Sequence, residues 1–306
     1  MKILLMTHKV DIDGMGSAVL AKLIYQNIDI LYLDTFEIND KLTELFDNKT
    51  IYCYDQIFIT DICPNEYNIQ KISKDTLLKN KVLILDHHIS MLEQLSKSYP
   101  IANIKIENEF GKCSGTSLFY DYLTKNKLLN ETPVIKEFVE LTRQYDTWEW
   151  KTKYNNENAN NLNIMFSILN LEKYVENYFK KLSKNLPVFD EQELNLINDF
   201  KLKQQKICEE YISKMHIEKV NGFICGVIDD MMDEYKNDTA EMLKEKNKEI
   251  DFVAMHITKR NTIAFRSVKP DFSVKEIAEF FGGKGHKPAS SCVLTDTAKT
   301  AFNIKI

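Results

Sequence analysis

The sequence lacks the features that mark membrane proteins, secreted proteins and proteins that coat nucleic acids. No apolar run approaches the roughly 20 residues that a transmembrane helix requires. The N-terminus has no basic segment followed by an apolar stretch and a small-residue cleavage site, so we expect no signal peptide. A net charge of −5 argues against binding to long nucleic acid through a basic surface, although a short nucleotide could still occupy a local pocket. We therefore expect a cytoplasmic protein with no membrane association.

Cysteine is sparse and unpatterned. The six cysteines form no Cys-x-x-Cys pair and no compact framework, which indicates reduced thiols rather than disulfides or a thiolate metal site. The chain of 306 residues is long enough for two domains, each with its own core. Its hydrophobic content of 44% and charged content of 28% are ordinary for a soluble protein.

Glycine and histidine are also scarce, so their positions carry information. Five of the nine glycines lie in two short stretches, at 14 and 16 and at 282, 283 and 285. Four of the six histidines are His8, His87, His88 and His286. Both residue types therefore concentrate in a few motifs.

Polar side chains follow three apolar runs in the N-terminal half. Val82–Leu85 is a continuous apolar run, as expected for a buried parallel strand, and it stops at Asp86-His87-His88. Ile3–Thr7 is followed by His8, Asp11 and Asp13, and Ile57–Thr60 is followed by Asp61. The carboxyl ends of parallel strands meet at one edge of a sheet, so these side chains should converge there. Carboxylates and imidazoles without thiolate favour a divalent metal such as manganese.

The alternation of apolar runs and helical patterns predicts an α/β protein with a doubly wound, mainly parallel sheet. Further strands are expected at Ile28–Leu33 and, in a smaller α/β domain, at Phe223–Ile228, Phe252–Ile257 and Thr262–Ser267, with Val293–Leu294 and Ala301–Ile306 closing that sheet. Helices are expected at Ser17–Tyr25, Thr116–Leu123, Pro133–Arg143, Ile164–Leu186, Phe189–Met215, Asp238–Glu245 and Val274–Phe281, with an asparagine-rich loop at 154–163. We expect a metal-binding catalytic domain at 1–188, a helical connector at 189–215 and a substrate-binding domain at 216–306.

Taken together, these motifs resemble the DHH phosphoesterase superfamily in its DHH plus DHHA1 architecture, and the Tyr145-Asp146-Thr147-Trp148 context resembles its oligoribonuclease branch. The resemblance implies two divalent ions, Mn²⁺ or Mg²⁺, with Asp61 bridging them. His8 and Asp11 would complete one site, and Asp13, His87 and Asp146 the other. Asp86 and His88 would act in catalysis by orienting ligands or stabilising the departing oxygen. The first motif departs from the family because Lys9 and Val10 separate His8 from Asp11, where one or three residues are usual, and this leaves open whether His8 is a ligand.

The C-terminal stretch Gly282-Gly283-Lys284-Gly285-His286 resembles the glycine-histidine motif of DHHA1, and Arg266-Ser267 resembles its other phosphate contact. The resemblance implies substrate-binding roles for Arg266, Ser267, Gly282, Gly283, Gly285 and His286. The glycines would offer backbone N–H groups, and Arg266 and His286 would make charge-assisted contacts to a phosphate. Tyr145 and Trp148 are candidates for stacking on bases.

The resulting hypothesis is a metal-dependent phosphodiesterase that degrades short oligoribonucleotides and also dephosphorylates 3′-phosphoadenosine 5′-phosphate. A cyclic-dinucleotide or cyclic-mononucleotide phosphodiesterase is the enzymatic alternative, and a nucleotide-binding module without catalysis is the other. The expected partners are short RNA or small nucleotides. The sequence leaves open the substrate, the direction of cleavage, the metal in the cell, and whether the chain forms a homodimer.

Overall fold

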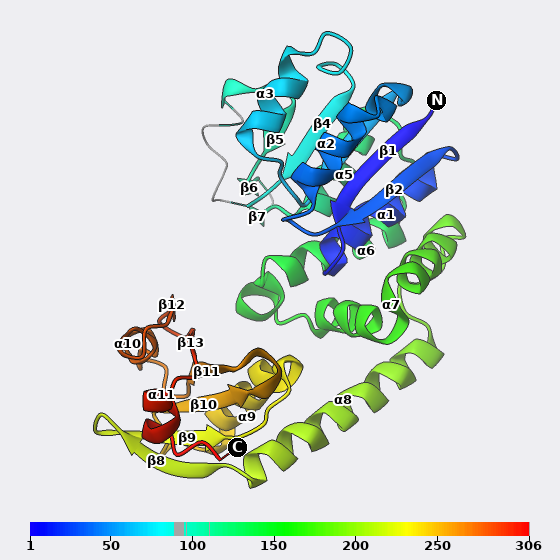
Figure 1. Cartoon of the computed structure of the whole chain (residues 1–306). Helices are drawn as coiled ribbons and strands as arrows, with labels where there is room; N and C mark the ends of the chain where they lie inside the picture. Colours follow the sequence, from blue (N-terminus) through cyan, green and yellow to red (C-terminus); the bar gives the residue numbers. More distant parts are fainter. Residues whose placement is uncertain (89–94, 96, 110, 306) are drawn as a thin grey trace. The chain divides into compact units, whose positions relative to one another are not determined.

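The structure is a computed structural model that describes residues 1–88, 95, 97–109 and 111–305. Contacts between residues divide the chain into two units, Met1–Ile197 and Asn198–Ile306 (Figure 1). The division falls within helix α8 (Glu191–Ser213), inside the segment that the sequence predicts as a connector. None of the described helices is apolar enough over a sufficient length to cross a membrane.

The first unit is built on a five-stranded sheet in which all neighbouring strands are parallel. The strand order is β2-β1-β3-β4-β5. This arrangement confirms the predicted doubly wound sheet, and four of the five strands were predicted to within one residue at each end. The strands are β1 (Ile3–His8), β2 (Ile28–Leu33), β3 (Gln56–Thr60), β4 (Val82–Asp86) and β5 (Ala102–Ile104).

Helices cover both faces of this sheet (Figure 1). Helices α2 (Ile38–Asp47) and α3 (Glu66–Lys74), neither of them predicted, bury Leu42 and Ile69 in one core with strand residues such as Ile59. On the other face, α1 contacts α5, α6 and α7, and the ring of Phe58 in β3 packs on Phe119 of α5 at 5.0 Å. These four helices are α1 (Ile12–Ile24), α5 (Gly115–Lys125), α6 (Pro133–Asp146) and α7 (Glu157–Ser183).

Capping side chains explain why helices α1 and α7 begin earlier than predicted. Helix α1 begins at Ile12 rather than Ser17 because the Asp11 side chain accepts hydrogen bonds from the first-turn N–H groups. The loop predicted at 154–163 is wrong beyond Asn156, since Asn156 caps Asn158 and α7 begins at Glu157. Asparagine-rich composition indicates a loop only when no asparagine serves as a cap. Short elements near this region are the hairpin β6 (Glu107–Asn108) and β7 (Gly111–Lys112), the turn η1 (Thr50–Cys53) and the single π-helical turn η3 (Trp150–Tyr154).

The second unit is a six-stranded mixed sheet in the order β12-β13-β11-β10-β9-β8. Strands β9 and β10 are parallel and the other pairs are antiparallel. The strands are β8 (His216–Val220), β9 (Phe223–Ile228), β10 (Phe252–Ile257), β11 (Thr262–Ser267), β12 (Lys284–His286) and β13 (Ala289–Val293). The predictions for β9, β10 and β11 are confirmed residue for residue.

Two cores lie on opposite faces of this sheet. One contains Phe252, Phe265 and Phe302, and the other contains Val253 and Leu243. The strand predicted at Ala301–Ile306 is wrong over its described residues. Phe302 instead follows the last residue of a helix, and its ring packs in the first core. The apolar pattern suggested a strand because an aromatic ring is buried equally well at a helix end. The helices are α9 (Lys236–Lys246), α10 (Lys275–Phe280) and α11 (Asp296–Ala301), with single turns at η4 (Asp233–Tyr235) and η5 (Thr258–Arg260).

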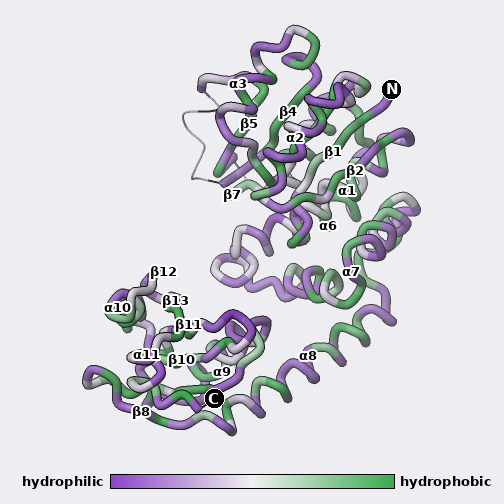
Figure 2. Tube along the Cα trace, in the orientation of Figure 1, coloured by the Kyte–Doolittle hydropathy of each residue, from purple (hydrophilic) through white to green (hydrophobic). Residues whose placement is uncertain are grey.

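Helix α8 is polar over most of its length. Hydrophilic and hydrophobic residues alternate along it in Figure 2, and apolar residues such as Leu196 and Leu202 are exposed. Its predicted charged, solvated face agrees with this exposure.

Candidate metal centre and phosphate pocket

Three neighbouring strands of the first sheet end at one edge, and each delivers polar side chains there. His8 is the last residue of β1, Asp61 directly follows β3, and Asp86 is the last residue of β4. Strands β1 and β3 are neighbours in the sheet, whereas β2 lies on the far side of β1. In doubly wound sheets, such a reversal of strand order opens a crevice at the carboxyl ends of the strands, where ligands bind. The topology therefore supplies the convergence that the sequence motifs predicted.

His8, Asp11 and Asp61 form one group of candidate ligands. His8 Nδ1 lies 2.7 Å from Asp11 Oδ2 and 3.6 Å from Asp61 Oδ2. Asp11 Oδ1 accepts hydrogen bonds from the N–H groups of Asp13 and Gly14, so only its Oδ2 faces His8. One ligand atom from each of the three residues lies within 4.8 Å of the other two. His8 thus reaches the group despite its unusual spacing from Asp11.

Asp13, His87 and Asp146 form a second group on the other side of Asp61. His87 Nε2 lies 3.7 Å from Asp13 Oδ2, 3.4 Å from Asp146 Oδ2 and 3.3 Å from Asp61 Oδ1. Asp61 therefore presents Oδ2 toward His8 and Oδ1 toward His87. A carboxylate placed this way can bridge two cations.

Helix α5 holds Asp13 in place, a feature that the sequence motifs did not reveal. The N–H groups of Gly115 and Thr116 donate to the two carboxylate oxygens of Asp13 at 2.6 and 2.9 Å. The first N–H groups of a helix have no partner within the helix and favour negative charge. The helix was predicted at Thr116–Leu123, and it begins one residue earlier, at Gly115. Ser114 and Ser117 form a capping box there, which is the sequence signal that could have identified this support.

Two glycines allow the backbone to approach the ligands closely. A Cβ atom at Gly115 would lie 2.7 Å from the Cβ of Asp61. A Cβ atom at Gly14 would lie 2.0 Å from the carbonyl oxygen of His8. Both distances are shorter than the contacts that Cβ atoms make in proteins. Only glycine therefore fits these positions without displacing the neighbouring residues.

Asp86 and His88 form a pair beside the two groups. Asp86 Oδ1 accepts hydrogen bonds from the backbone N–H of His87 and pairs with His88 Nδ1, both at 2.8 Å. Asp86 is buried, whereas the His88 side chain is 51% exposed. The buried carboxylate therefore orients an imidazole whose other ring nitrogen can face a substrate. Asp86 also lies within ligand distance of Asp61, His87 and His88.

Burial and mutual repulsion disturb the protonation of this cluster. Burial, followed by the charges of Asp13 and Asp11, holds the pKa of Asp61 well above its usual range. Burial and the charge of Asp13 do the same to the pKa of Asp146. Burial alone would lower the pKa of His8, but the carboxylates of Asp11 and Asp61 outweigh it and raise the pKa of His8 to about 10. The cluster therefore carries more negative charge than its own residues neutralise.

The donor set fits divalent cations. Asp61 Oδ2 and Asp146 Oδ2 are buried and accept no hydrogen bond from any described residue. Leaving buried carboxylate oxygens without a hydrogen bond is costly, and a bound cation removes that cost. Carboxylate oxygens with imidazole nitrogens and no thiolate suit hard to borderline metals. The two groups of ligands that share Asp61 can hold two such ions.

An aromatic cluster follows Asp146. Trp148 has a left-handed backbone, with φ at 62°, and its side chain is half exposed. Its ring meets that of Trp150 edge-on at 5.5 Å. The buried Glu149 next to it pairs with Arg143 of α6, so the chain is anchored directly after Trp148. Tyr145, the other predicted stacking residue, has its ring stacked with Trp150 at 6.3 Å.

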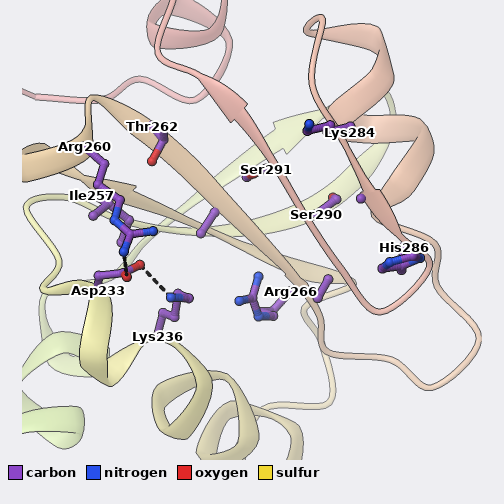
Figure 3. Close-up of a pocket in the computed structure, with 13 residues that line it drawn as sticks. Asp233, Lys236, Ile257, Arg260, Thr262, Arg266, Lys284, His286, Ser290 and Ser291 are labelled. Carbon is purple, nitrogen blue, oxygen red and sulfur yellow. Dashed lines mark hydrogen bonds and ion pairs between the residues drawn. The ribbon is translucent and has the colours of Figure 1, made fainter. Parts of the chain in front are cut away.

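The second unit contains a cavity of about 640 Å³. Figure 3 shows its lining, which comes from η4, α9, η5 and strands β10, β11, β12 and β13. Of the residues predicted to bind substrate, Arg266, Gly285 and His286 line the cavity. Arg266 Nε donates to Asn237 Oδ1 at 3.1 Å, and its Nη1 donates to the carbonyl of Phe265 at 2.9 Å.

The other three predicted substrate contacts have structural roles. The N–H groups of Gly282 and Gly283 donate to the carbonyls of Glu279 and Ala278. These glycines therefore end helix α10 rather than offering donors to an anion, because Gly282 supplies the positive φ that such an end requires. The hydroxyl of Ser267 is turned away into a loop, where it donates to the carbonyls of Lys269 and Phe272.

Known proteins are similar to this chain both within the first unit and over nearly the whole length. Residues 2–143 match the family described as DHH family, N-terminal domain. The chain is 29% identical over 300 residues to the oligoribonuclease NrnB of Bacillus subtilis, covering 95% of this chain and 73% of that protein.

Two solved structures share the fold. One is PggH of Vibrio cholerae, described as a pGpG-specific phosphodiesterase, with a TM-score of 0.56 and 12% identity over 98% of this chain and 95% of that one. The other is the exonuclease RecJ bound to manganese, with a TM-score of 0.50 and 12% identity over 99% of this chain and 88% of that one. The Asp86-His87-His88 triplet at the edge of the doubly wound sheet lies within residues 2–143, the part of the chain that matches the DHH family, and the comparisons support a phosphoester hydrolase.

Proposed function

We propose that the protein is a metal-dependent phosphodiesterase that hydrolyses short oligoribonucleotides. The observation that carries the proposal is the position of Asp61 between two groups of ligands, one with His8 and Asp11 and one with Asp13, His87 and Asp146. The similarity to an oligoribonuclease over 95% of the chain supports the substrate class.

The metal ions would be Mn²⁺ or Mg²⁺, and the manganese bound to the structurally similar RecJ supports the former. His8, Asp11 and Asp61 would hold one ion, and Asp13, His87, Asp146 and Asp61 the other. Such a pair of ions stabilises the charge that develops on attacking and leaving oxygens during phosphoryl transfer.

Asp86 and His88 would carry out proton transfer at the reacting phosphate. Asp86 holds the Nδ1 edge of His88, which leaves Nε2 as the nitrogen that gives or takes a proton. Because Asp86 also accepts the backbone N–H of His87, it positions a metal ligand and the exposed His88 together. His88 would therefore donate a proton to the oxygen that leaves the scissile phosphate.

The cavity of the second unit would bind a phosphate of the substrate that is remote from the scissile bond. Arg266 and His286 would supply charge-assisted hydrogen bonds to this phosphate. Trp148, beside the metal ligand Asp146, would stack on a base without reading its identity.

A substrate panel tests this proposal. The full chain with added Mn²⁺ is assayed on 5′-phosphorylated RNA of 2 to 10 nucleotides, on cyclic dinucleotides and on 3′-phosphoadenosine 5′-phosphate. We expect the highest kcat/KM for RNA of two to five nucleotides. Faster cleavage of cyclic dinucleotides would instead favour a signalling phosphodiesterase, and binding without turnover on every substrate would favour a binding module.

A further inference from the structure

The cavity of the second unit carries more positive charge than one phosphate needs. Four of its lining side chains, Lys236, Arg260, Arg266 and Lys284, are cationic at neutral pH, and Asp233 is its one acidic lining residue. This excess contrasts with the net charge of −5 of the whole chain. A concentration of positive charge in a cavity favours a ligand with more than one negative group.

Asp233 holds two of these cations side by side. Lys236 Nζ lies 2.6 Å from Asp233 Oδ1, and Arg260 Nη2 lies 3.0 Å from Asp233 Oδ2. Each carboxylate oxygen thus binds one cation, and the three groups together keep one positive charge. No other carboxylate in the described part of the chain lies within ion-pair distance of Lys236 or Arg260. Asp233 therefore holds both side chains near each other while they keep N–H donors for a ligand.

Arg266 forms a separate cationic position in the same cavity. Its hydrogen-bond acceptors, the side chain of Asn237 and the carbonyl of Phe265, are both neutral. Asn237 directly follows Lys236, so this contact brings Arg266 next to the first turn of α9. In Figure 3 the side chains of Lys236 and Arg266 extend toward each other, while Arg260 and Asp233 lie beyond Lys236. The cavity therefore has two adjacent positive positions, which its volume of about 640 Å³ can accommodate within one nucleotide-sized ligand.

We propose that Lys236 and Arg260 form a second phosphate subsite beside that of Arg266 and His286. The cavity then holds a nucleotide segment with two phosphates, one on each subsite. This inference extends the proposed function, because it gives the second unit a preference for substrates with a further phosphate. A 5′-phosphorylated dinucleotide has one phosphate besides the scissile one, whereas a trinucleotide has two. Occupation of both subsites therefore favours the trinucleotide.

A binding experiment on the full chain in EDTA tests the subsite directly. Without cations the acidic cluster of the first unit repels phosphate, so binding reports on the cavity. The probes are adenosine 5′-monophosphate and adenosine 3′,5′-bisphosphate. We expect the wild type to bind the bisphosphate about tenfold more tightly than the monophosphate, as one further charge-assisted contact provides.

Variants then locate that preference. Lys236→Gln and Arg260→Gln should each reduce it, and the double variant should abolish it, because bisphosphate affinity should fall about tenfold more than monophosphate affinity. Lys236→Arg should retain it because the charge remains. Lys259→Gln is the matched control, since Lys259 is an exposed neighbour of Arg260 outside the cavity lining. A preference that survives the double variant, or that Lys259→Gln removes equally, would overturn the second subsite.

Turnover with Mn²⁺ separates this inference from the proposed function. In the double variant, KM should rise about tenfold more for pApApA than for pApA. An equal rise for both substrates overturns the subsite, because it indicates only a general loss of positive charge. Absence of hydrolysis of either substrate by the wild type would instead refute the proposed function and leave the binding result to stand by itself.

Discussion

The carboxylate of Asp13 accepts a 2.6 Å hydrogen bond from the backbone N–H of Gly115, 102 positions further along the chain. The same Gly115 packs against Asp61, the residue shared by the two groups of ligands. The start of α5 thus fixes two carboxylates of the candidate metal centre at once. Several consequences of this arrangement can be measured.

Gly115→Ala should impair catalysis through position rather than chemistry. The added Cβ would lie 2.7 Å from Asp61 Cβ, so Asp61 must shift. We expect a loss of stability of about 1–3 kcal/mol, as in other overpacked sites, and a fall in kcat of at least about tenfold. Gly222→Ala is the control, because Gly222 has a positive φ but no neighbour within 4 Å, so stability should fall while kcat stays unchanged. An unchanged kcat in Gly115→Ala would contradict the proposed positioning of Asp61.

Asp61→Asn should abolish hydrolysis yet stabilise the metal-free protein. Burial and neighbouring carboxylates raise the pKa of Asp61 in the folded state. A carboxyl whose folded pKa exceeds its ordinary value of about 3.9 destabilises the fold once the pH rises above that value. In EDTA at pH 7.5 the variant should therefore have a higher Tm than the wild type, and the difference should vanish below about pH 4.

The measurement for Asp61→Asn is a pair of thermal unfolding curves in EDTA across this pH range, with kcat determined in Mn²⁺. Activity should fall at least about 100-fold, because both ligand groups lose a shared oxygen. Asp47→Asn, at an exposed position on α2, should change neither quantity. A lower Tm in EDTA for the Asp61 variant would contradict the repulsive cluster.

His8→Asn should remove one of two bound ions. His8 belongs to the group with Asp11 and Asp61, whereas His87 belongs to the other. Titration of the metal-free protein with Mn²⁺, followed by electron paramagnetic resonance, should find two ions on the wild type and one tight ion on the variant. His216→Asn in the second unit should bind two. Two tightly bound ions on His8→Asn would show that His8 is not a ligand.

Addition of Mn²⁺ should stabilise the wild type against heat. A ligand that binds only the folded state adds about 2.7 kcal/mol at 100 times its Kd. Asp146→Asn removes a buried oxygen that has no described hydrogen-bond partner, so the stabilisation by Mn²⁺ should shrink. Tm measured with and without Mn²⁺ checks this, and Ca²⁺ as a non-catalytic cation separates binding from turnover. An equal shift in both proteins would argue against Asp146 as a ligand.

Trp148→Gly should preserve stability and weaken substrate binding. A bulky side chain at a φ of 62° is strained, and glycine adopts this conformation freely. Because the ring is half exposed, relief of strain should offset its loss, and the free energy of unfolding should stay within about 1 kcal/mol of wild type. KM for pApA should rise about tenfold, as expected for loss of one stacked base. Trp148→Phe should keep most of the affinity, and an unchanged KM in the glycine variant would refute the stacking role.

Sequence alone located most of the longer strands and the polar residues at their ends, but not β5, β8 or β12. Apolar runs bounded by acid and histidine are local patterns, so β9, β10 and β11 were located residue for residue and the N-terminal sheet nearly so. The same patterns identified Asp61 and His87 as neighbours, since parallel strands bring their carboxyl ends together. Helices α2 and α3 were not predicted, although their buried residues recur at helical spacing and Asn65 caps α3.

Only the tertiary structure decided which atoms meet. The hydrogen bond from Gly115 to Asp13 depends on α5 packing against α1, β3 and β4, and no local pattern encodes that distance. Likewise, Gly282 and Gly283 look like anion donors in the sequence, yet the helix end before them already uses their N–H groups. Conversely, Asp233 pairs with Arg260 across 27 positions only because η4 and η5 lie at one edge of the cavity. Residue types are set by the sequence. Which of their charged and polar groups pair depends on the fold, because a backbone group that is already hydrogen-bonded no longer binds a ligand.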